Sequence, residues 1–302
     1  MHEFWMFPGQ GYQHEGMLKD VPSSLINKVE NLTGIKLLDT TEAYQDSLQI
    51  QLGILILQIY QINILKQQGF EPTLVSGHSL GIFAAAYAAN IIKLDNVIRL
   101  VYKRATLMKN SYPQGYGMGV IVGLTSSEVT KLVNQVNSST EPVYASNQNA
   151  ELQIAISGKI TALNKVIALA KANGAQKAQL IKVPVPSHSP LMIDVAKQLS
   201  DFLKNIPLTS SSIRYLADYN GTVVKSLTDV RYDLGNNLVY PVYWNNLTNV
   251  ALEFRPDVAI EFSPGHAFSK LIKTKTSDIK TLAIDDYGLS DSLFLLNKWK
   301  RG

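Results

Sequence analysis

A serine, a histidine and an arginine in this chain have the residue types and surroundings that nucleophilic chemistry needs. Ser79 is the central residue of Gly77-His78-Ser79-Leu80-Gly81, which fits the pattern G-x-S-x-G. In that pattern the serine lies on a sharp turn between a strand and a helix, where its hydroxyl is exposed. The same pattern also arises by chance in glycine-bearing loops, so the flanking elements must decide between a nucleophile and an ordinary turn.

The residues around Ser79 favour the strand–turn–helix context. Residues 73–75 indicate the end of a buried strand, and residues 82–89 are rich in helix formers. Gly77 and Gly81 are the small residues that a strained turn needs, because a Cβ at either position would crowd the opposite arm. The N-terminus of the helix that follows favours negative charge, which suits an oxyanion beside Ser79.

His188 is the histidine best placed to serve Ser79 as a general base. It lies between Pro186 and Pro190, and prolines on both sides exclude regular structure and make the loop stiff. A histidine on a rigid loop is held in place and can be aimed at a nucleophile. The alternative is a histidine that only packs at the hinge between two parts of the chain.

Arg104 lies on the apolar face of a helix expected over residues 95–111. The residues three and four positions away on either side are Leu100, Val101, Leu107 and Met108. A buried guanidinium without a partner is very costly, so Arg104 should meet an anion. The spacing leaves open whether this anion is a protein carboxylate in a core ion pair or a bound ligand.

A glycine-rich turn follows the first expected strand. The apolar segment Glu3–Phe7 runs directly into Pro8-Gly9-Gln10-Gly11. Because Gln10 stands between two glycines, its backbone amide would be little obstructed and could approach another group closely. An ordinary tight turn explains the same residues.

The order of the elements that must position these residues predicts an α/β fold. Residues 46–68 are apolar nearly all round, which indicates a central buried helix. From residue 115 the pattern becomes strand–helix–strand–strand–helix–strand, the βαββαβ order of a ferredoxin-like unit. We therefore expect a large catalytic domain built from residues 1–114 and 187–302, with residues 115–186 inserted as a small domain.

Composition narrows the classes of function. The chain has 302 residues, of which 46% are hydrophobic and 17% charged, with a net charge of +4, as expected of a globular protein. It has no cysteine, so it has no disulfide, zinc-thiolate site or cysteine nucleophile, and we expect no metal site. No nucleic-acid motif is present. Residues 52–65 are too short and too polar to span a bilayer, and residues 1–7 do not form a signal peptide, so we expect a cytoplasmic protein without a membrane partner.

Five segments stand together in a characteristic order: Phe7–Gly11, Gly77–Gly81, Arg104, Pro186-Ser187-His188 and Glu261…Pro264-Gly265. In this order the chain resembles the malonyl-CoA:acyl carrier protein transacylases over essentially its whole length. The resemblance implies a hydrolase-like large domain with a parallel sheet and a nucleophile elbow, plus an inserted ferredoxin-like domain.

The branch that the chain resembles most is the epsilon subunit of malonate decarboxylase. The features that suggest this branch lie in residues 81–86, 112–118 and 263–266. In members that serve fatty-acid synthesis, an acidic residue commonly follows the second glycine of the elbow, whereas this chain has Ile82.

The resemblance implies a role for each residue already singled out. Ser79 would attack the malonyl thioester with His188 as general base, forming a Ser–His dyad. The backbone amides of Gln10 and Leu80 would hold the oxyanion. Arg104 would bind the free malonyl carboxylate through a pair of hydrogen bonds.

Three further residues are implied in the substrate pocket. These are His78, Asn149 and Tyr243, and Asn147 competes with Asn149 for the same role. Tyr243 replaces the glutamine of Pro-Val-Gln-Trp, a position whose backbone carbonyl orients the histidine in the family. A backbone acceptor survives a change of side chain, so the dyad is still expected here.

The implied reaction transfers a malonyl group from malonyl-CoA, through a malonyl-serine intermediate, to the phosphopantetheine-type thiol of a carrier. No permanently bound cofactor is implied. The carrier would be the carrier subunit of malonate decarboxylase or, for a transacylase of fatty-acid or polyketide synthesis, a free acyl carrier protein. Two other classes stay open: a serine hydrolase (thioesterase), which would need an acid between Ser79 and His188 in chain order, and a non-catalytic subunit that only docks a carrier.

Overall fold

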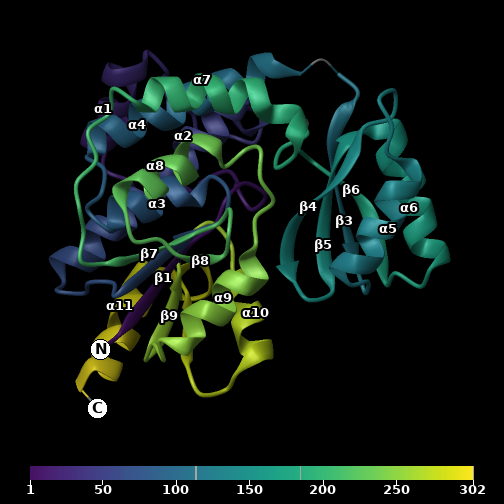
Figure 1. Ribbon diagram of the computed structural model, residues 1–302. Helices are drawn as coiled ribbons and strands as arrows, with labels where there is room; N and C mark the ends of the chain where they lie inside the picture. Colours follow the sequence, from purple (N-terminus) through teal and green to yellow (C-terminus); the bar gives the residue numbers. More distant parts are fainter. Residues whose placement is uncertain (113, 184, 302) are drawn as a thin grey trace.

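The computed structural model describes residues 1–112, 114–183 and 185–301. The chain forms two separate sheets, each with its own covering helices (Figure 1). Pro113, which belongs to the segment 112–118 that suggested the malonate decarboxylase branch, lies outside the described residues.

The larger sheet has six strands in the order β10–β9–β1–β2–β7–β8. Its strands are β1 (Glu3–Phe7), β2 (Leu74–Gly77), β7 (Arg214–Ala217), β8 (Thr222–Val223), β9 (Val258–Glu261) and β10 (Lys280–Ala283). Neighbouring strands are parallel except for the pair β7–β8. The α/β fold with a parallel sheet is therefore confirmed.

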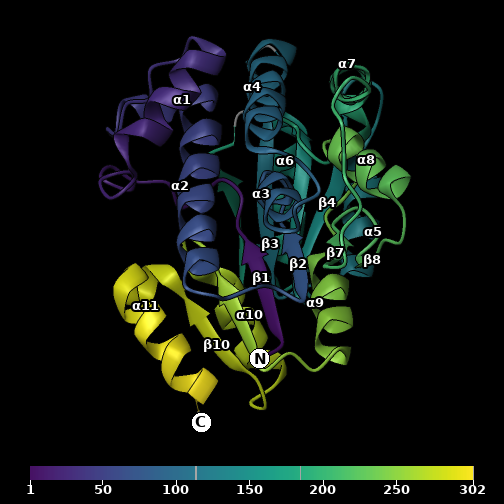
Figure 2. The ribbon, with the colours of Figure 1, turned by 90° about the vertical axis from the view of Figure 1, so that its left-hand side faces the viewer.

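Helices cover both faces of this sheet, as the alternation along β1 requires. Trp5 and Phe7 point into a core shared with one group of helices, whereas Phe4 and Met6 point into a second core on the other face. The first group is α1 (Ser23–Thr33), α2 (Ser47–Gln67), α3 (Gly81–Ala88), α4 (Leu94–Ser111), α7 (Ile193–Leu203), α8 (Leu227–Asn236) and α11 (Ile284–Arg301). The second is α9 (Trp244–Glu253) and α10 (Ala267–Lys275). Figure 2 shows α11 beside the edge strand β10.

Helix α2 is the central helix that the sequence predicts. By length and composition it could cross a membrane, but 67% of its apolar window is buried inside the protein, as in the core helix of a globular domain. Three of its glutamines are buried, and each bonds to a separate segment of the chain. Gln51 contacts Arg104, Gln58 donates to the carbonyl of Pro8, and Gln61 donates to Ser263.

The smaller sheet has four antiparallel strands in the order β4–β5–β3–β6. Along the chain these are β3 (Tyr116–Val122), α5 (Ser126–Val136), β4 (Val143–Ala150), β5 (Gln153–Lys159), α6 (Ile160–Ala172) and β6 (Lys177–Ile181), so the expected βαββαβ order is present. Helices α5 and α6 cover the outer face of this sheet, and the inner face turns toward the larger sheet (Figure 1).

Three elements differ from the sequence-based expectation. The sequence predicts a strand over residues 143–146, but β4 continues to Ala150 because two register shifts keep it paired with β5. It predicts a helix over residues 232–238, but α8 starts at Leu227 because the Ser226 hydroxyl caps the N–H of Asp229. Helix α11 was not expected, since Gly288 interrupts its pattern with a φ of 75°.

Candidate active site

Ser79 lies on the sharp turn between β2 and α3, with a φ of 56°. A Cβ on Gly77 would lie 1.9 Å from the carbonyl carbon of Gly81, so Gly77 must be glycine for the two arms to meet. A Cβ on Gly81 would lie 1.8 Å from the carbonyl oxygen of Phe7. The requirement for Gly81 therefore comes from the neighbouring strand β1, and the expected crowding of the opposite arm is wrong for this residue.

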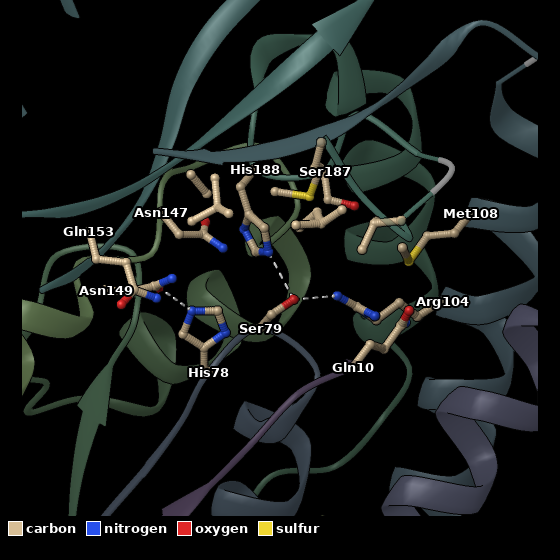
Figure 3. Close-up of a pocket in the computed structure, with 15 residues that line it drawn as sticks. Gln10, His78, Ser79, Arg104, Met108, Asn147, Asn149, Gln153, Ser187 and His188 are labelled. Atoms are coloured by element: carbon tan, nitrogen blue, oxygen red, sulfur yellow. Dashed lines mark hydrogen bonds between the residues drawn. The ribbon is translucent and has the colours of Figure 1, made fainter. Parts of the chain in front are cut away.

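His188 and Ser79 form a hydrogen-bonded pair across 109 residues of chain. The distance from His188 Nε2 to Ser79 Oγ is 2.8 Å (Figure 3). The distance from His188 Nδ1 to the carbonyl oxygen of Tyr240 is 3.1 Å. Because a carbonyl only accepts, the proton lies on Nδ1, and Nε2 is free to accept from the Ser79 hydroxyl.

The loop that carries His188 is held from both sides. The backbone N–H of His188 donates to Leu238 O over 2.7 Å, and the Ser189 hydroxyl donates to Pro186 O over 2.7 Å. Burial, with the nearby His78 and Arg104, lowers the pKa of His188 to about 3. The imidazole is therefore neutral at physiological pH, which is the form that a general base needs.

The carbonyl that orients His188 belongs to Tyr240, so the expected use of the Tyr243 carbonyl is wrong. Tyr243 precedes α9, and its carbonyl accepts the N–H of Leu247 as the helix begins. Its side chain is 38% exposed and does not line the cavity beside Ser79. The expected place of Tyr243 in the pocket is therefore also wrong, and the orienting carbonyl lies three residues earlier.

Arg104 is only 1% exposed, and its guanidinium points at Ser79. Nη2 donates to Ser79 Oγ over 3.1 Å (Figure 3). Nη2 also donates to Asn237 Oδ1 over 3.3 Å, and Nη1 donates to Gln51 Oε1 over 2.6 Å. Nε is buried without a partner among the described residues. Burial lowers the pKa of Arg104 to about 9, and the carboxyl group of Asp218 opposes that shift.

No carboxylate forms an ion pair with Arg104 within the described ranges 1–112, 114–183 and 185–301. Of the two partners that the sequence allows for this side chain, the core ion pair is therefore wrong. Only neutral groups hold the guanidinium, so its charge is available to an anion that enters the cavity.

Two backbone amides beside Ser79 can receive an oxyanion. In the part of the chain that the structure describes, the N–H groups of Gln10 and Leu80 donate to no other residue. Gly9 lets the Gln10 loop approach the elbow, because a Cβ there would lie 2.7 Å from the carbonyl oxygen of His78. Gln58 fixes the same loop through Pro8 O, at 2.9 Å.

The two asparagines that competed for one place both line the cavity. Asn149 Oδ1 accepts from His78 Nε2 over 2.9 Å, which joins the small sheet to the elbow (Figure 3). Asn147 Oδ1 accepts the N–H of Val242 over 3.3 Å. His78 packs against Trp244, and burial lowers its pKa to about 4, so its ring is neutral.

These side chains surround one cavity of about 270 Å³ between the two sheets. Its walls come from the strands of the smaller sheet, from helix α4 and from loops, among them those that follow β1 and β2: Gln10, His78, Ser79, Arg104, Met108, Met118, Val120, Asn147, Asn149, Gln153, Ala155, Ile181, Val183, Ser187 and His188. A larger hollow of about 1260 Å³ adjoins it and shares Gln10, Met108, Met118, Ile181 and Val183 with it. Among the described residues, no three His, Asp or Glu side chains gather as a metal site.

The sequence reasoning missed Gln51, Asp218, Asn237 and Tyr240. Gln51 carried a usable signal, because a polar residue on an otherwise apolar buried helix must meet a polar partner. Asp218, Asn237 and Tyr240 lie just beyond the ends of β7 and α8, far from Ser79 in the sequence. Nothing in the residues around them indicates that they contact the elbow.

Comparisons with known proteins show which family the chain belongs to. The family model described as "Acyl transferase domain" matches residues 4–284. The malonyl CoA-acyl carrier protein transacylase of Haemophilus influenzae is 30% identical over 95% of this chain and 96% of its own, and that of Bacillus subtilis is 28% identical over 93% of each. FabD from Acinetobacter baumannii superposes with a TM-score of 0.91 at 28% identity, covering 98% of both chains. A malonyl-transacylase solved with its type II PKS acyl-carrier protein superposes with a TM-score of 0.89 at 27% identity, covering 97% of this chain and 98% of its own. The chain therefore belongs to the acyl transferase domain family.

Proposed function

We propose that this chain is a malonyl-CoA:acyl carrier protein transacylase. The observation that carries the proposal is the position of Arg104, whose guanidinium has no carboxylate partner among the described residues and lies 3.1 Å from Ser79 Oγ. A nucleophile next to a buried cation suits an acyl group with a carboxylate close to its thioester, and malonyl is such a group.

The first half-reaction follows from the hydrogen bonds of Ser79. Its Oγ attacks the thioester carbonyl carbon while His188 Nε2 takes the hydroxyl proton. The N–H groups of Gln10 and Leu80 hold the negative charge on the carbonyl oxygen. When the C–S bond breaks, the imidazolium returns the proton to the departing CoA thiolate, and malonyl-Ser79 is left in the cavity.

The second half-reaction reverses these roles with a different thiol. His188 takes the proton from the phosphopantetheine-type thiol of the carrier, and the thiolate attacks the acyl-serine carbonyl. The C–O bond to Ser79 then breaks, the His188 imidazolium returns the proton to Ser79 Oγ, and malonyl-carrier leaves with the enzyme restored. The hollow of about 1260 Å³ that opens from the cavity offers a path for a long thiol-bearing arm. The two half-reactions share one site, so the kinetics should be ping-pong.

We also propose roles for the other pocket residues and boundaries for the domains. We assign His78, Asn147 and Asn149 to the pocket wall and Leu80 and Gln10 to the oxyanion site. Residues 115–186 are proposed as a ferredoxin-like small domain inserted between 1–114 and 187–302, which the βαββαβ order of elements supports. A cytoplasmic location stays a prediction.

The type II acyl carrier protein is the carrier that the comparisons favour. The curated relatives are named malonyl CoA-acyl carrier protein transacylases, and one structural neighbour is a malonyl-transacylase solved with a type II PKS acyl-carrier protein. The malonate decarboxylase assignment rests only on the sequence motifs given above. Its carrier subunit is therefore the second partner to test.

A serine hydrolase has less support. The acids between Ser79 and His188 in the chain include Asp95 and Glu141, which form surface ion pairs with Lys28 and Lys159. The partner of His188 Nδ1 is a backbone carbonyl, so the site contains a Ser–His dyad without a carboxylate.

The test is to supply malonyl-CoA with holo acyl carrier protein, with the malonate decarboxylase carrier, and with neither. Rapid formation of malonyl-carrier together with slow CoA release in the absence of a carrier would support the proposal. Fast CoA release to water alone would show a thioesterase. No acylation of Ser79 under any of these conditions would leave only a docking subunit.

A further inference from the structure

Two buried carboxyl groups lie directly behind the nucleophile elbow, and the mechanism above does not use them. Asp218 follows the last residue of β7, and Asp233 lies on α8; they are 1% and 0% exposed. The Tyr215 hydroxyl donates to Asp233 Oδ2 over 2.6 Å. Two neighbouring acids in a dry interior are costly, so their arrangement calls for a physical reason.

Asp218 is hydrogen-bonded directly to the backbone of Ser79 and is connected to Arg104 through Asn237. Its Oδ2 accepts the backbone N–H of Ser79 over 3.1 Å and the side-chain amide of Asn237 over 3.0 Å. The same amide donates to Ser79 O over 3.2 Å, and Asn237 Oδ1 accepts from Arg104 Nη2 over 3.3 Å. Asn237 therefore connects the elbow, the arginine and the buried acid pair.

The other oxygen of Asp218 shows where a proton lies. Asp218 Oδ1 is buried and meets no N–H or O–H donor among the described residues. Its neighbour is the carboxyl group of Asp233, whose charge acts on it. Two ionised carboxylates have only acceptor oxygens and repel each other in a dry interior, so we expect one of the two to carry a proton.

The surroundings indicate which acid holds that proton. Asp233 accepts from the Tyr215 hydroxyl and from the backbone N–H of Tyr219, which stabilises its charged form. Asp218 Oδ1, in contrast, meets no such donor among the described residues, and burial together with the charge of Asp233 raises the pKa of Asp218 well above its ordinary value. Tyr215, Tyr219 and Arg104 are the other titratable side chains facing the pair.

This protonation has a consequence for substrate binding. Asp218 is the acid whose charge acts on the Arg104 guanidinium. An ionised Asp218 would be an internal anion beside the arginine and would compete with a substrate carboxylate for its charge. A neutral Asp218 still accepts the N–H of Ser79 without competing.

We propose that Asp233 keeps Asp218 protonated and that this leaves Arg104 free to bind the carboxylate of the acyl group. Both acids are positioning residues, since they act through Ser79, Asn237 and Arg104 and do not reach the cavity. The inference rests on the proposed function, because it explains how the chain selects a carboxylated acyl group.

The test compares Asp218→Asn, Asp233→Asn and the double variant by the ratio of kcat/KM for malonyl-CoA to that for acetyl-CoA. Asp218→Asn imitates the neutral acid, because its amide donates to Asp233 and its oxygen accepts from Ser79. It should keep the ratio near that of the wild type. Asp233→Asn removes the charge that holds the proton on Asp218, so Asp218 ionises and the ratio should fall about tenfold, mainly through a higher KM for malonyl-CoA. The double variant should recover the ratio.

Infrared difference spectroscopy detects the proton without any turnover. The spectrum of the wild type minus that of Asp218→Asn at neutral pH should contain the C=O band of a protonated carboxyl group. Absence of that band, failure of Asp218→Asn to fold, or an equal loss of the ratio in both single variants would overturn the inference. A wild type that does not prefer malonyl over acetyl would instead refute the proposed function, and the infrared band would still test the proton.

Discussion

Replacing Arg104 should remove the preference of this chain for malonyl over acetyl groups. The guanidinium is buried and is held only by the neutral groups Gln51, Ser79 and Asn237 within the described part of the chain. A malonyl carboxylate that enters the cavity would therefore be its first anionic partner. The conservative variant is Arg104→Gln, because an amide can still meet Gln51 and leaves less empty space than alanine.

The expected magnitude follows from the strength of charge-assisted hydrogen bonds. A hydrogen bond to a charged group contributes roughly 1.5–3 kcal/mol, and about 1.4 kcal/mol corresponds to a factor of ten. Loss of the arginine should therefore lower the malonyl-to-acetyl ratio of kcat/KM by about 10- to 100-fold. The rate with acetyl-CoA should change much less, since acetyl has no carboxylate.

The assay measures transfer from malonyl-CoA and from acetyl-CoA to the same holo carrier. Arg99→Gln is the matched control, because Arg99 lies on the exposed face of the same helix α4 and should leave the ratio unchanged. If the malonyl-to-acetyl ratio of kcat/KM is unchanged in Arg104→Gln while Ser79 is still acylated, Arg104 does not bind the malonyl carboxylate.

Three other predictions concern pH, stability and the elbow. Because burial lowers the pKa of His188 from its ordinary value of 6.5 to about 3, kcat/KM should show no acid limb from this residue near pH 6.5. A clear limb there in a pH–rate profile would contradict the neutral state of His188. Burial raises the pKa of Glu3 from its ordinary value of 4.5 to about 7, so the folded state holds this proton more tightly than the unfolded state and loses stability as the pH rises to about 7. Glu3→Gln should therefore raise the free energy of unfolding near pH 8 by up to about 3 kcal/mol and should have little effect near pH 4. Denaturant titrations that give the same change in the free energy of unfolding at both pH values would contradict this prediction. Gly77→Ala should abolish activity, because its Cβ would collide with the backbone of Gly81. Gly53→Ala is the control and should be tolerated, because its Cβ would meet only the flexible end of Met17, at 3.0 Å. A Gly77→Ala protein that is folded and active would refute the account of the elbow.

Much of the fold could be predicted because its local signals are strong. The apolar strand Glu3–Phe7, the buried helix α2 and the βαββαβ order all follow from periodicity and from punctuation by glycine. The Ser79 elbow could also be predicted, since its glycines and its helix are adjacent in sequence. Helix α11 could not, because Gly288 breaks the pattern in its first turns.

The site was only partly predictable for a different physical reason. Ser79, Arg104 and His188 carry local signals of a turn, an apolar face and a stiff loop. Their partners do not, since Tyr240 and Asn237 reach the site through long-range packing. The carbonyl that orients His188 shows the limit of prediction from sequence. It was expected at Tyr243 and lies at Tyr240, three residues earlier in the same loop, where no periodicity fixes which carbonyl faces the histidine.

The covalent intermediate tests the central claim most directly. Wild-type protein is mixed with radioactive malonyl-CoA in the absence of a carrier, digested, and mapped by mass spectrometry, with Ser79→Ala treated alongside. We expect label on the peptide that contains Ser79, its release onto holo carrier when carrier is added, and no label on Ser79→Ala. Label on another residue, or transfer to the carrier at full rate by Ser79→Ala, would contradict the account.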